Sequence, residues 1–156
     1  MKAMTQSRHD LNLSWGKYDA MWLLQEYLKE LTSLSDPSSD FARNVGQAKG
    51  VLLTSRKTAD APEEKVGGAN IQIFHDYALI DVIWIRPEYR SQGLGRLLVN
   101  EVERHAIEIG LRRLLLSAFE HQNSIEFWKR LGCEEVGRVR DYPAGKQLVY
   151  LHKRLA

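Results

Sequence analysis

The sequence is poor in the features that mark disulfide-linked, metal-binding and membrane proteins. It contains a single cysteine, Cys133, which excludes an internal disulfide and a metal site built from cysteines. Its apolar runs are short: residues 79–85 are interrupted by Asp81, whereas a membrane helix needs about 20 apolar residues. Residues 1–10 are polar and hold no apolar segment of the signal-peptide type. These absences predict a cytoplasmic protein that does not associate with a membrane.

A strong excess of one charge is also lacking. The formal net charge is +2, and the basic residues of 101–113 alternate with glutamates, as on an ordinary solvated surface. Nucleic-acid binders instead gather basic residues on one face, so we expect no nucleic-acid partner. The histidines show no metal-ligand spacing, and we expect no metal. His121 follows a predicted strand and is a candidate for lining a site, although a surface position is the more usual one.

What is present fits one globular domain over residues 1–156, since the length and apolar content suffice for one core. Apolar periodicity, proline and glycine positions predict alternating elements. The predicted strands are 11–15, 51–54, 66–74, 77–85, 113–119, 134–140 and 147–153. The predicted helices are 18–34, 39–48, 93–109 and 124–131. This order predicts a mixed α/β (α+β) fold with helices on both faces of the sheet.

The helix at 93–109 has the clearest pattern. Its predicted apolar face consists of Leu94, Leu97, Leu98, Val102, Ala106 and Ile109. Gly110 follows where a left-handed C-terminal cap belongs.

A glycine-containing turn joins the strand at 77–85 to this helix. Its residues are Arg90, Ser91, Gln92, Gly93, Leu94 and Gly95, followed by Arg96. The start of a helix presents unpaired N–H groups and the positive end of the helix dipole, which favour a bound phosphate. Gly93 and Gly95 remove side chains that would keep a diphosphate from the backbone. The turn therefore predicts a phosphate-binding site.

The type of nucleotide follows from what the turn lacks. A Walker loop needs Lys followed by Ser or Thr after its last glycine, and a dinucleotide fold needs a third glycine. Neither is present. Coenzyme A fits better, while a different nucleotide-binding fold that takes ATP or NAD stays open as an alternative.

The turn and its surroundings resemble the GNAT superfamily of N-acetyltransferases. Arg90-x-x-Gly93-x-Gly95 is similar to that family's signature, and the segments 83–89 (IWIRPEY) and 127–133 (FWKRLGC) are similar to its lead-in strand and its Phe-Tyr-Glu-Lys-Leu-Gly-Phe segment. The resemblance covers about residue 66 to the C-terminus. It implies a single-domain GNAT-like fold: a mixed, mostly antiparallel sheet of six to seven strands.

The resemblance also implies a cofactor site for acetyl-CoA as co-substrate. Two neighbouring strands, 79–85 and 113–119, are expected to splay around the pantetheine arm. Backbone groups of Trp84 and Ile85 would pair with the arm, Arg90 to Arg96 would hold the pyrophosphate, and Asn123 would hydrogen-bond the pantetheine.

Asp81 is the candidate general base, because it interrupts an apolar strand where an unpaired charge is costly. Counting back by twos from Ile85 places Ile83, Asp81 and Leu79 on one face, which we expect to meet the acceptor. The resemblance agrees, since many family members carry Glu there. A structural aspartate paired with an arginine or a backbone N–H is the alternative.

The general acid departs from the family pattern. Trp128 stands where the family often has tyrosine, and an indole N–H does not give up its proton. Three explanations fit: Trp128 only steadies the thiolate, another tyrosine (Tyr142 or Tyr89) reaches the sulfur, or turnover is inefficient. The alternative is that Trp128 is an aromatic residue packed in the core, with no part in catalysis. Cys133 is expected to be a small core residue rather than an acylated nucleophile.

These features predict transfer of an acetyl group from acetyl-CoA to a primary amine of a small molecule or peptide. The alternative is a CoA-binding regulatory module with little or no turnover. The loops expected over the site, 18–41 and 141–146, do not identify the amine. The final hairpin offers a surface for a homodimer.

Overall fold

The computed structural model describes residues 11–16, 22–23, 26–27, 30, 48–73, 77–120 and 123–155. Within these ranges the strands are β1 (Leu11–Gly16), β2 (Ala48–Ser55), β3 (Glu64–Ile73), β4 (Tyr77–Ile85), β5 (Arg113–Phe119), β6 (Glu134–Arg140) and β7 (Gln147–Arg154). The helices are α2 (Leu94–Glu108) and α3 (Ser124–Arg130), with a 3₁₀ turn at Pro87–Tyr89. Most of the predicted helix 18–34 and all of 39–47 lie outside the described residues; Trp22, Leu23, Glu26, Tyr27 and Glu30 are helical.

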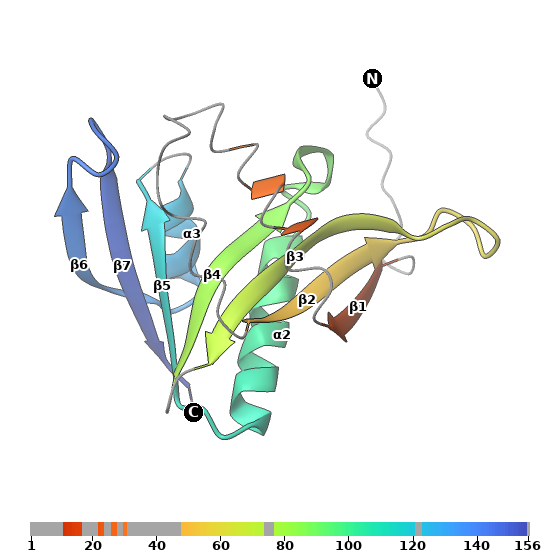
Figure 1. Cartoon of the computed structure of the whole chain (residues 1–156), viewed down its shortest axis with the longest axis horizontal. Helices are drawn as coiled ribbons and strands as arrows, with labels where there is room; N and C mark the ends of the chain where they lie inside the picture. The colour runs from red at the N-terminus through yellow and green to blue at the C-terminus, as the bar shows by residue number, and fades with distance from the viewer. Residues whose placement is uncertain are drawn as a thin grey trace.

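All seven strands belong to one sheet, in the order β1-β2-β3-β4-β5-β7-β6 (Figure 1). Only β4 and β5 run parallel, and the other neighbours are antiparallel. Helix α2 connects the parallel pair, as a crossover between parallel strands requires. The prediction of a mixed, mostly antiparallel sheet is confirmed.

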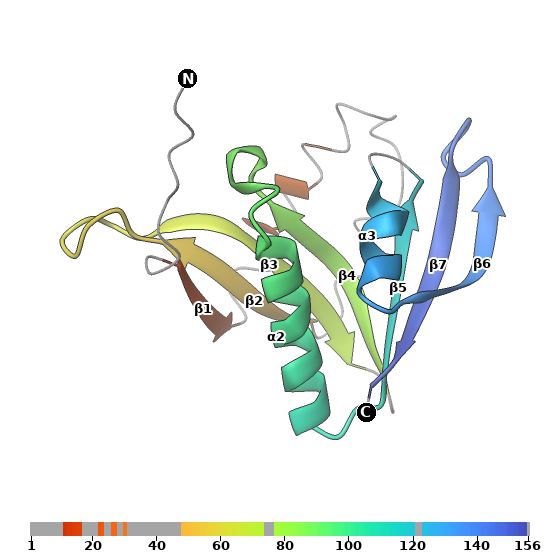
Figure 2. The same cartoon turned by 180° about the vertical axis from the view of Figure 1, so that it is seen from behind.

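Helices cover both faces of the sheet. On one face, α2 and α3 lie side by side over the strands and share one continuous core with them (Figure 2). On the other face, the buried Leu23 packs against Val82 and Trp84 of β4, with Trp22 and Tyr27 beside it. The predicted two-sided cover is therefore confirmed.

The buried stripe of α2 is narrower than predicted. Leu94, Leu98, Val102 and Ala106 are buried, together with Val99. Leu97 and Ile109 are exposed, contrary to the sequence prediction. At 100° per residue Leu97 lies on the far side of the helix from the centre of the stripe, and Ile109 is already the C-terminal cap residue.

A β-bulge changes which β4 residues share a face. Ile71 of β3 pairs with Ile80, but the preceding Asn70 pairs with Val82, so Asp81 is an extra residue without a partner in the register. As a result Ile83 and Ile85 lie on the α2 face together with Ala78 and Ile80. The simple alternation that grouped Ile85, Ile83 and Leu79 was wrong, because one inserted residue reverses the alternation beyond it.

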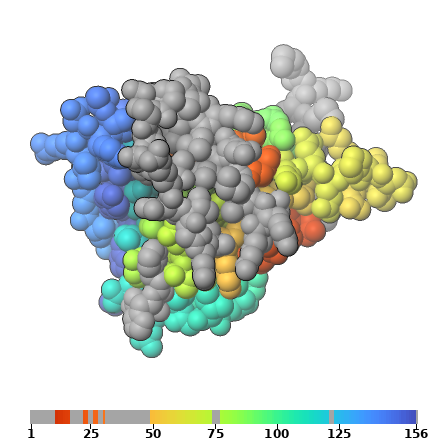
Figure 3. Space-filling view, in the orientation of Figure 1, coloured from red at the N-terminus to blue at the C-terminus, as the bar shows by residue number. Residues whose placement is uncertain are grey.

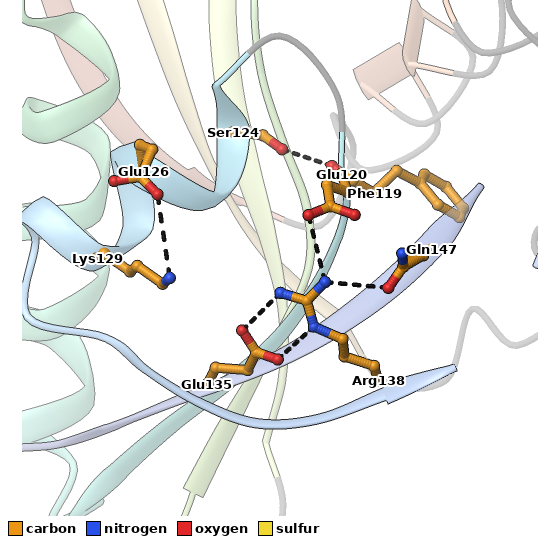
Figure 4. A network of polar contacts seen from close by, with 8 residues as sticks. All are labelled: Phe119, Glu120, Ser124, Glu126, Lys129, Glu135, Arg138 and Gln147. Carbon is orange, nitrogen blue, oxygen red and sulfur yellow. Dashed lines mark hydrogen bonds and ion pairs between the residues drawn. The ribbon is translucent and has the colours of Figure 1, made fainter. Parts of the chain in front are cut away.

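Strand β6 forms one edge of the sheet, at the blue end of the molecule opposite the projecting yellow β2–β3 connection (Figure 3). Its Arg138 joins three elements: the guanidinium contacts Glu135 at 2.5 Å, Glu120 after β5 at 3.2 Å and Gln147 of β7 at 3.0 Å (Figure 4). Exposed ion pairs of this kind contribute little to stability individually. They nevertheless fix the edge strand relative to the end of β5.

Candidate functional site

Strands β4 and β5 separate halfway along their length. Their parallel pairing runs from Tyr77↔Arg113 to Ile80↔Leu116 and ends there, while β5 stays paired with β7 to its last residue, Phe119. The separation begins at the Asp81 bulge. A bulge bends its strand and increases the local twist, which accounts for the divergence of β4 from β5. The second half of β4 thus offers one of its edges to a gap in the sheet.

A cavity of about 720 Å³ fills this gap. Its walls are the diverging halves of β4 and β5, the turn before α2, the first residues of α2 and α3, and the side chains of Tyr27 and Glu30. This volume lies in the range typical of small-molecule and cofactor sites. Strand, turn and helix N-termini therefore converge on one space.

The cavity brings together most of the predicted site residues. Those in its lining are Asp81, Trp84, Ile85, Arg90, Ser91, Gly93, Leu94, Gly95, Arg96, Asn123 and Trp128. Two predicted residues are not part of the lining. Gln92 is exposed, and its amide Nε2 donates to the Glu88 carbonyl at 3.4 Å. Tyr142 lies in the β6–β7 turn and is 41% exposed.

The turn before α2 has the backbone shape of an anion site. Ser91 and Gly93 both adopt positive φ, 59° and 79°, a region that favours glycine. Gly93 is the N-cap of α2 and provides no side chain to cap the first-turn N–H groups. Such N–H groups attract a phosphate. Arg96 is exposed nearby, and its guanidinium donates no hydrogen bond to another of the described residues.

Gly95 also has a role in packing, in addition to the one inferred from sequence. A Cβ at this position would lie 3.1 Å from Cζ and 3.2 Å from Cε2 of Phe127. The glycine therefore allows close packing of α2 against α3, and the hydroxyl of Ser124 donates to the Phe119 carbonyl at 2.6 Å to hold the start of α3 on the end of β5. Packing between the two helices thus sets the width of the cavity at this end.

The side chain of Arg90 contacts protein groups. Its Nε donates to the Ile85 carbonyl at 2.8 Å and its Nη2 to Glu30 at 2.6 Å. The guanidinium also lies 5.9 Å from the Trp84 ring centre. In this arrangement the guanidinium connects the turn to β4 and to Glu30.

Asp81 lies at the fork of the two strands and lines the cavity. Burial raises the pKa of its carboxyl, and a hydrogen bond from Gln72 opposes that rise in pKa. A carboxylate with a raised pKa is a better proton acceptor than a surface aspartate. The geometry and the direction of the pKa shift are those expected of a general base.

The aromatic residues of the cavity lining include Trp128, Tyr89 and Tyr27. Trp128 is buried in the core, in edge contact with Phe127 at 5.1 Å between ring centres, and it also lines the cavity. Tyr89 lines the cavity, and its hydroxyl donates to Glu64 at 3.4 Å. Burial and the nearby Glu30 carboxylate raise the pKa of Tyr27 to about 12, so its hydroxyl stays protonated at neutral pH.

Cys133 is a buried core residue, as predicted. Burial raises the pKa of its thiol to about 11, which leaves little thiolate at neutral pH. Among the residues that the structure describes, no group of three or more His, Cys, Asp or Glu side chains could hold a metal ion. In the same part of the chain no helix is long and apolar enough to cross a membrane. His121 lies outside the described residues.

The lining also includes Tyr27 and Glu30, from the segment 18–41 that was expected over the site, but sequence reasoning did not single out Glu30 or Arg130. Tyr27 and Glu30 reach the cavity from a segment more than 50 residues before the turn, and no local pattern connects the two. Arg130 also lines the cavity, and its guanidinium, like that of Arg96, has no hydrogen-bond partner among the described residues. Arg130 is three residues after Phe127, and this spacing places both on one side of α3. The spacing could therefore have indicated Arg130 as a residue of the lining.

The sequence and the fold of this chain are similar to those of known acetyltransferases. The model of the "Acetyltransferase (GNAT) family" matches residues 18–133. An uncharacterised N-acetyltransferase of Methanocaldococcus jannaschii is 38% identical over 68 residues, which cover 43% of this chain but only 30% of that protein. Among solved structures, an acetyltransferase from Bacillus cereus is 26% identical with a TM-score of 0.60, over 90% of this chain and 94% of that one. The ribosomal-protein-S18-alanine N-acetyltransferase of Escherichia coli is 22% identical with a TM-score of 0.69, over 93% and 95% of the two chains.

Proposed function

Because the chain belongs to the GNAT acetyltransferase family, we propose that it transfers an acetyl group from acetyl-CoA to a primary amine. The observation that supports this most directly is the separation of β4 and β5 at Asp81, which opens onto the N-terminus of α2. One cavity thereby joins an anion-binding turn to a half-buried carboxylate. A diphosphate-bearing acyl donor and an amine acceptor need these two features side by side.

The cavity residues fit acetyl-CoA. The uncapped N-terminus of α2 and the exposed Arg96 suit the diphosphate, and Arg130 adds a second positive charge to the lining. The edge of β4 at Trp84 and Ile85 suits the pantetheine arm, since no strand pairing from β5 extends beyond Ile80. Asn123 at the start of α3 lines the cavity and offers a side-chain amide to the same arm. When bound, acetyl-CoA would supply the thioester that is attacked.

The chemistry requires the acceptor to lose a proton. Asp81 takes that proton from the acceptor ammonium, directly or through a water, so that the neutral amine attacks the thioester carbonyl. The bond from carbon to sulfur breaks, the new amide bond forms, and the sulfur leaves as a thiolate. A thiol of pKa about 8.5 is a tolerable leaving group. Tyr27, held protonated in the lining, donates a hydrogen bond toward the leaving sulfur.

Trp128 fits the alternative of a packed aromatic residue better than a role at the thiolate. It is buried between α3 and the sheet, so its role is to pack the cavity wall. Tyr142 is exposed in the β6–β7 turn and does not belong to the cavity lining. Tyr27 and Tyr89 are the tyrosines that line the cavity among the described residues.

The acceptor is proposed only as a primary amine on a small molecule or a peptide. The name of the Escherichia coli protein specifies a protein alanine as its acceptor, and a peptide N-terminus is therefore one member of the first panel to test. The other members are a lysine side chain, a polyamine and an amino sugar.

The test combines binding and turnover. Calorimetric titration with acetyl-CoA, with ATP and NAD as controls, should show saturable binding of acetyl-CoA alone. Release of free thiol with the amine panel should then follow. Failure to bind acetyl-CoA would refute the proposal, whereas binding without thiol release for any amine would favour the regulatory module.

A further inference from the structure

The Glu30 carboxylate connects three parts of the cavity wall. Its Oε2 accepts a hydrogen bond from Arg90 Nη2 at 2.6 Å and another from the indole Nε1 of Trp84. Arg90 belongs to the turn before α2 and Trp84 to the diverging half of β4. These donors lie 60 and 54 residues from Glu30 in the sequence. One carboxylate therefore holds together groups that only the tertiary fold brings near one another.

The ion pair is partly shielded from solvent. The side chains of Arg90 and Glu30 are 35% and 29% exposed. Arg90 is further fixed by its bond to the Ile85 carbonyl and by the Trp84 ring. A charge-assisted bond with this support is stronger than an isolated surface pair, although solvent still screens it.

Glu30 also lies close to Tyr27 in the cavity wall. Tyr27 is three residues earlier in the sequence and lines the same space. The two residues interact, since the Glu30 carboxylate contributes to the raised pKa of the Tyr27 hydroxyl. The segment with Tyr27 is thus attached through Glu30 to the strand and the turn proposed to hold the cofactor.

We propose that Glu30 is a positioning residue that fastens the Tyr27 side of the cavity to Trp84 and Arg90 and keeps the Arg90 guanidinium directed at the protein. This inference rests on the proposed function. It assigns the Arg90 side chain to the architecture of the site and leaves the diphosphate to the backbone of the turn, Arg96 and Arg130.

The proposal predicts opposite effects on the two substrates. In Glu30→Gln the Tyr27 segment loses its charged attachment, so the acceptor KM rises about tenfold and kcat falls, as for the loss of one charge-assisted hydrogen bond. The Kd of acetyl-CoA stays the same or decreases, because the positive charge of Arg90 is no longer neutralised beside the anionic cofactor. Glu30→Asp keeps the charge and should recover part of the acceptor KM.

The experiment measures acetyl-CoA Kd by calorimetry, acceptor KM and kcat by thiol release, and Tm, for wild type, Glu30→Gln, Glu30→Asp and Arg90→Met. Glu126→Gln on the exposed side of α3 is the matched control and should behave as wild type. A raised acceptor KM with an unweakened acetyl-CoA Kd supports the proposal.

Two results would overturn it. In the first, Glu30→Gln behaves like Glu126→Gln. In the second, Kd, KM and Tm all deteriorate together, which would mean that Glu30 only stabilises the fold. A wild-type protein that does not bind acetyl-CoA would instead refute the proposed function itself, and this inference with it.

Discussion

Two neighbouring glycines of β3 provide a paired test of whether the diverging half of β4 forms the cofactor site. A Cβ at Gly67 would lie 2.4 Å from the carbonyl oxygen of Trp84 and 3.0 Å from Cα of Ile85. A Cβ at Gly68 would lie 2.5 Å from the carbonyl oxygen of Val51 in β2, on the side of β3 away from the cavity. Both substitutions by alanine therefore crowd backbone, but only the first crowds the cavity wall.

The size of the displacement follows from these distances. Ordinary contact begins at 3.4 Å, so residue 67 and Trp84 must separate by about 1.0 Å in Gly67→Ala, and residue 68 and Val51 by about 0.9 Å in Gly68→Ala. Overpacking of this kind costs about 1–3 kcal/mol of folding free energy in either variant. A shift of about 1 Å in a group that positions substrate costs on the order of 100-fold in rate, and we expect at least a tenfold rise in Kd, about 1.4 kcal/mol.

The assay is urea unfolding of both variants, followed by acetyl-CoA titration at a temperature where each is folded. We expect similar losses of stability, with weakened acetyl-CoA binding in Gly67→Ala only. Equal affinities in the two variants would contradict the assignment of the β4 edge as part of the cofactor site.

Three further predictions concern single side chains. Asp81→Asn should lower kcat by about 10²–10⁴-fold while stabilising the fold at neutral pH. Burial raises the pKa of Asp81 in the folded protein above its usual 3.8. The wild type therefore loses stability relative to Asp81→Asn as pH rises from 3.8 through the folded pKa. Unfolding curves at several pH values would contradict this if the stability advantage of the variant shrank with rising pH. Cys133 should react slowly with a thiol reagent at pH 8 in the folded protein and completely in denaturant, since burial raises its pKa to about 11; fast labelling of folded protein would place the thiol elsewhere. Tyr142→Phe should leave kcat unchanged, because Tyr142 is outside the cavity lining, whereas Tyr27→Phe should lower it; the reverse order in a thiol-release assay would restore Tyr142 as the proton donor.

Local patterns determined most of the fold from sequence. The helix at 94–108 and the strands at 77–85, 113–119 and 134–140 follow from apolar periodicity, proline and glycine, because these signals act over a few residues. The turn at Arg90–Gly95 was identifiable for the same reason, since its positive φ at Gly93 and its place before a helix are local properties.

Tertiary structure decided the features that depend on pairing between distant segments. The bulge at Asp81 is a mismatch of register between β3 and β4, and alternation read along β4 alone misassigned the faces of the strand. The close packing at Gly95 comes from Phe127 on another helix. The Glu30 contacts with Trp84 and Arg90 span more than 50 residues, and hydrogen bonds over such separations leave no periodic trace in a sequence. The sequence by itself thus determined the turn before α2 and predicted a phosphate site there, because both depend on neighbouring residues. The register of the sheet and the packing between helices decided the width of the cavity and the side chains that line it, because both depend on contacts between distant segments.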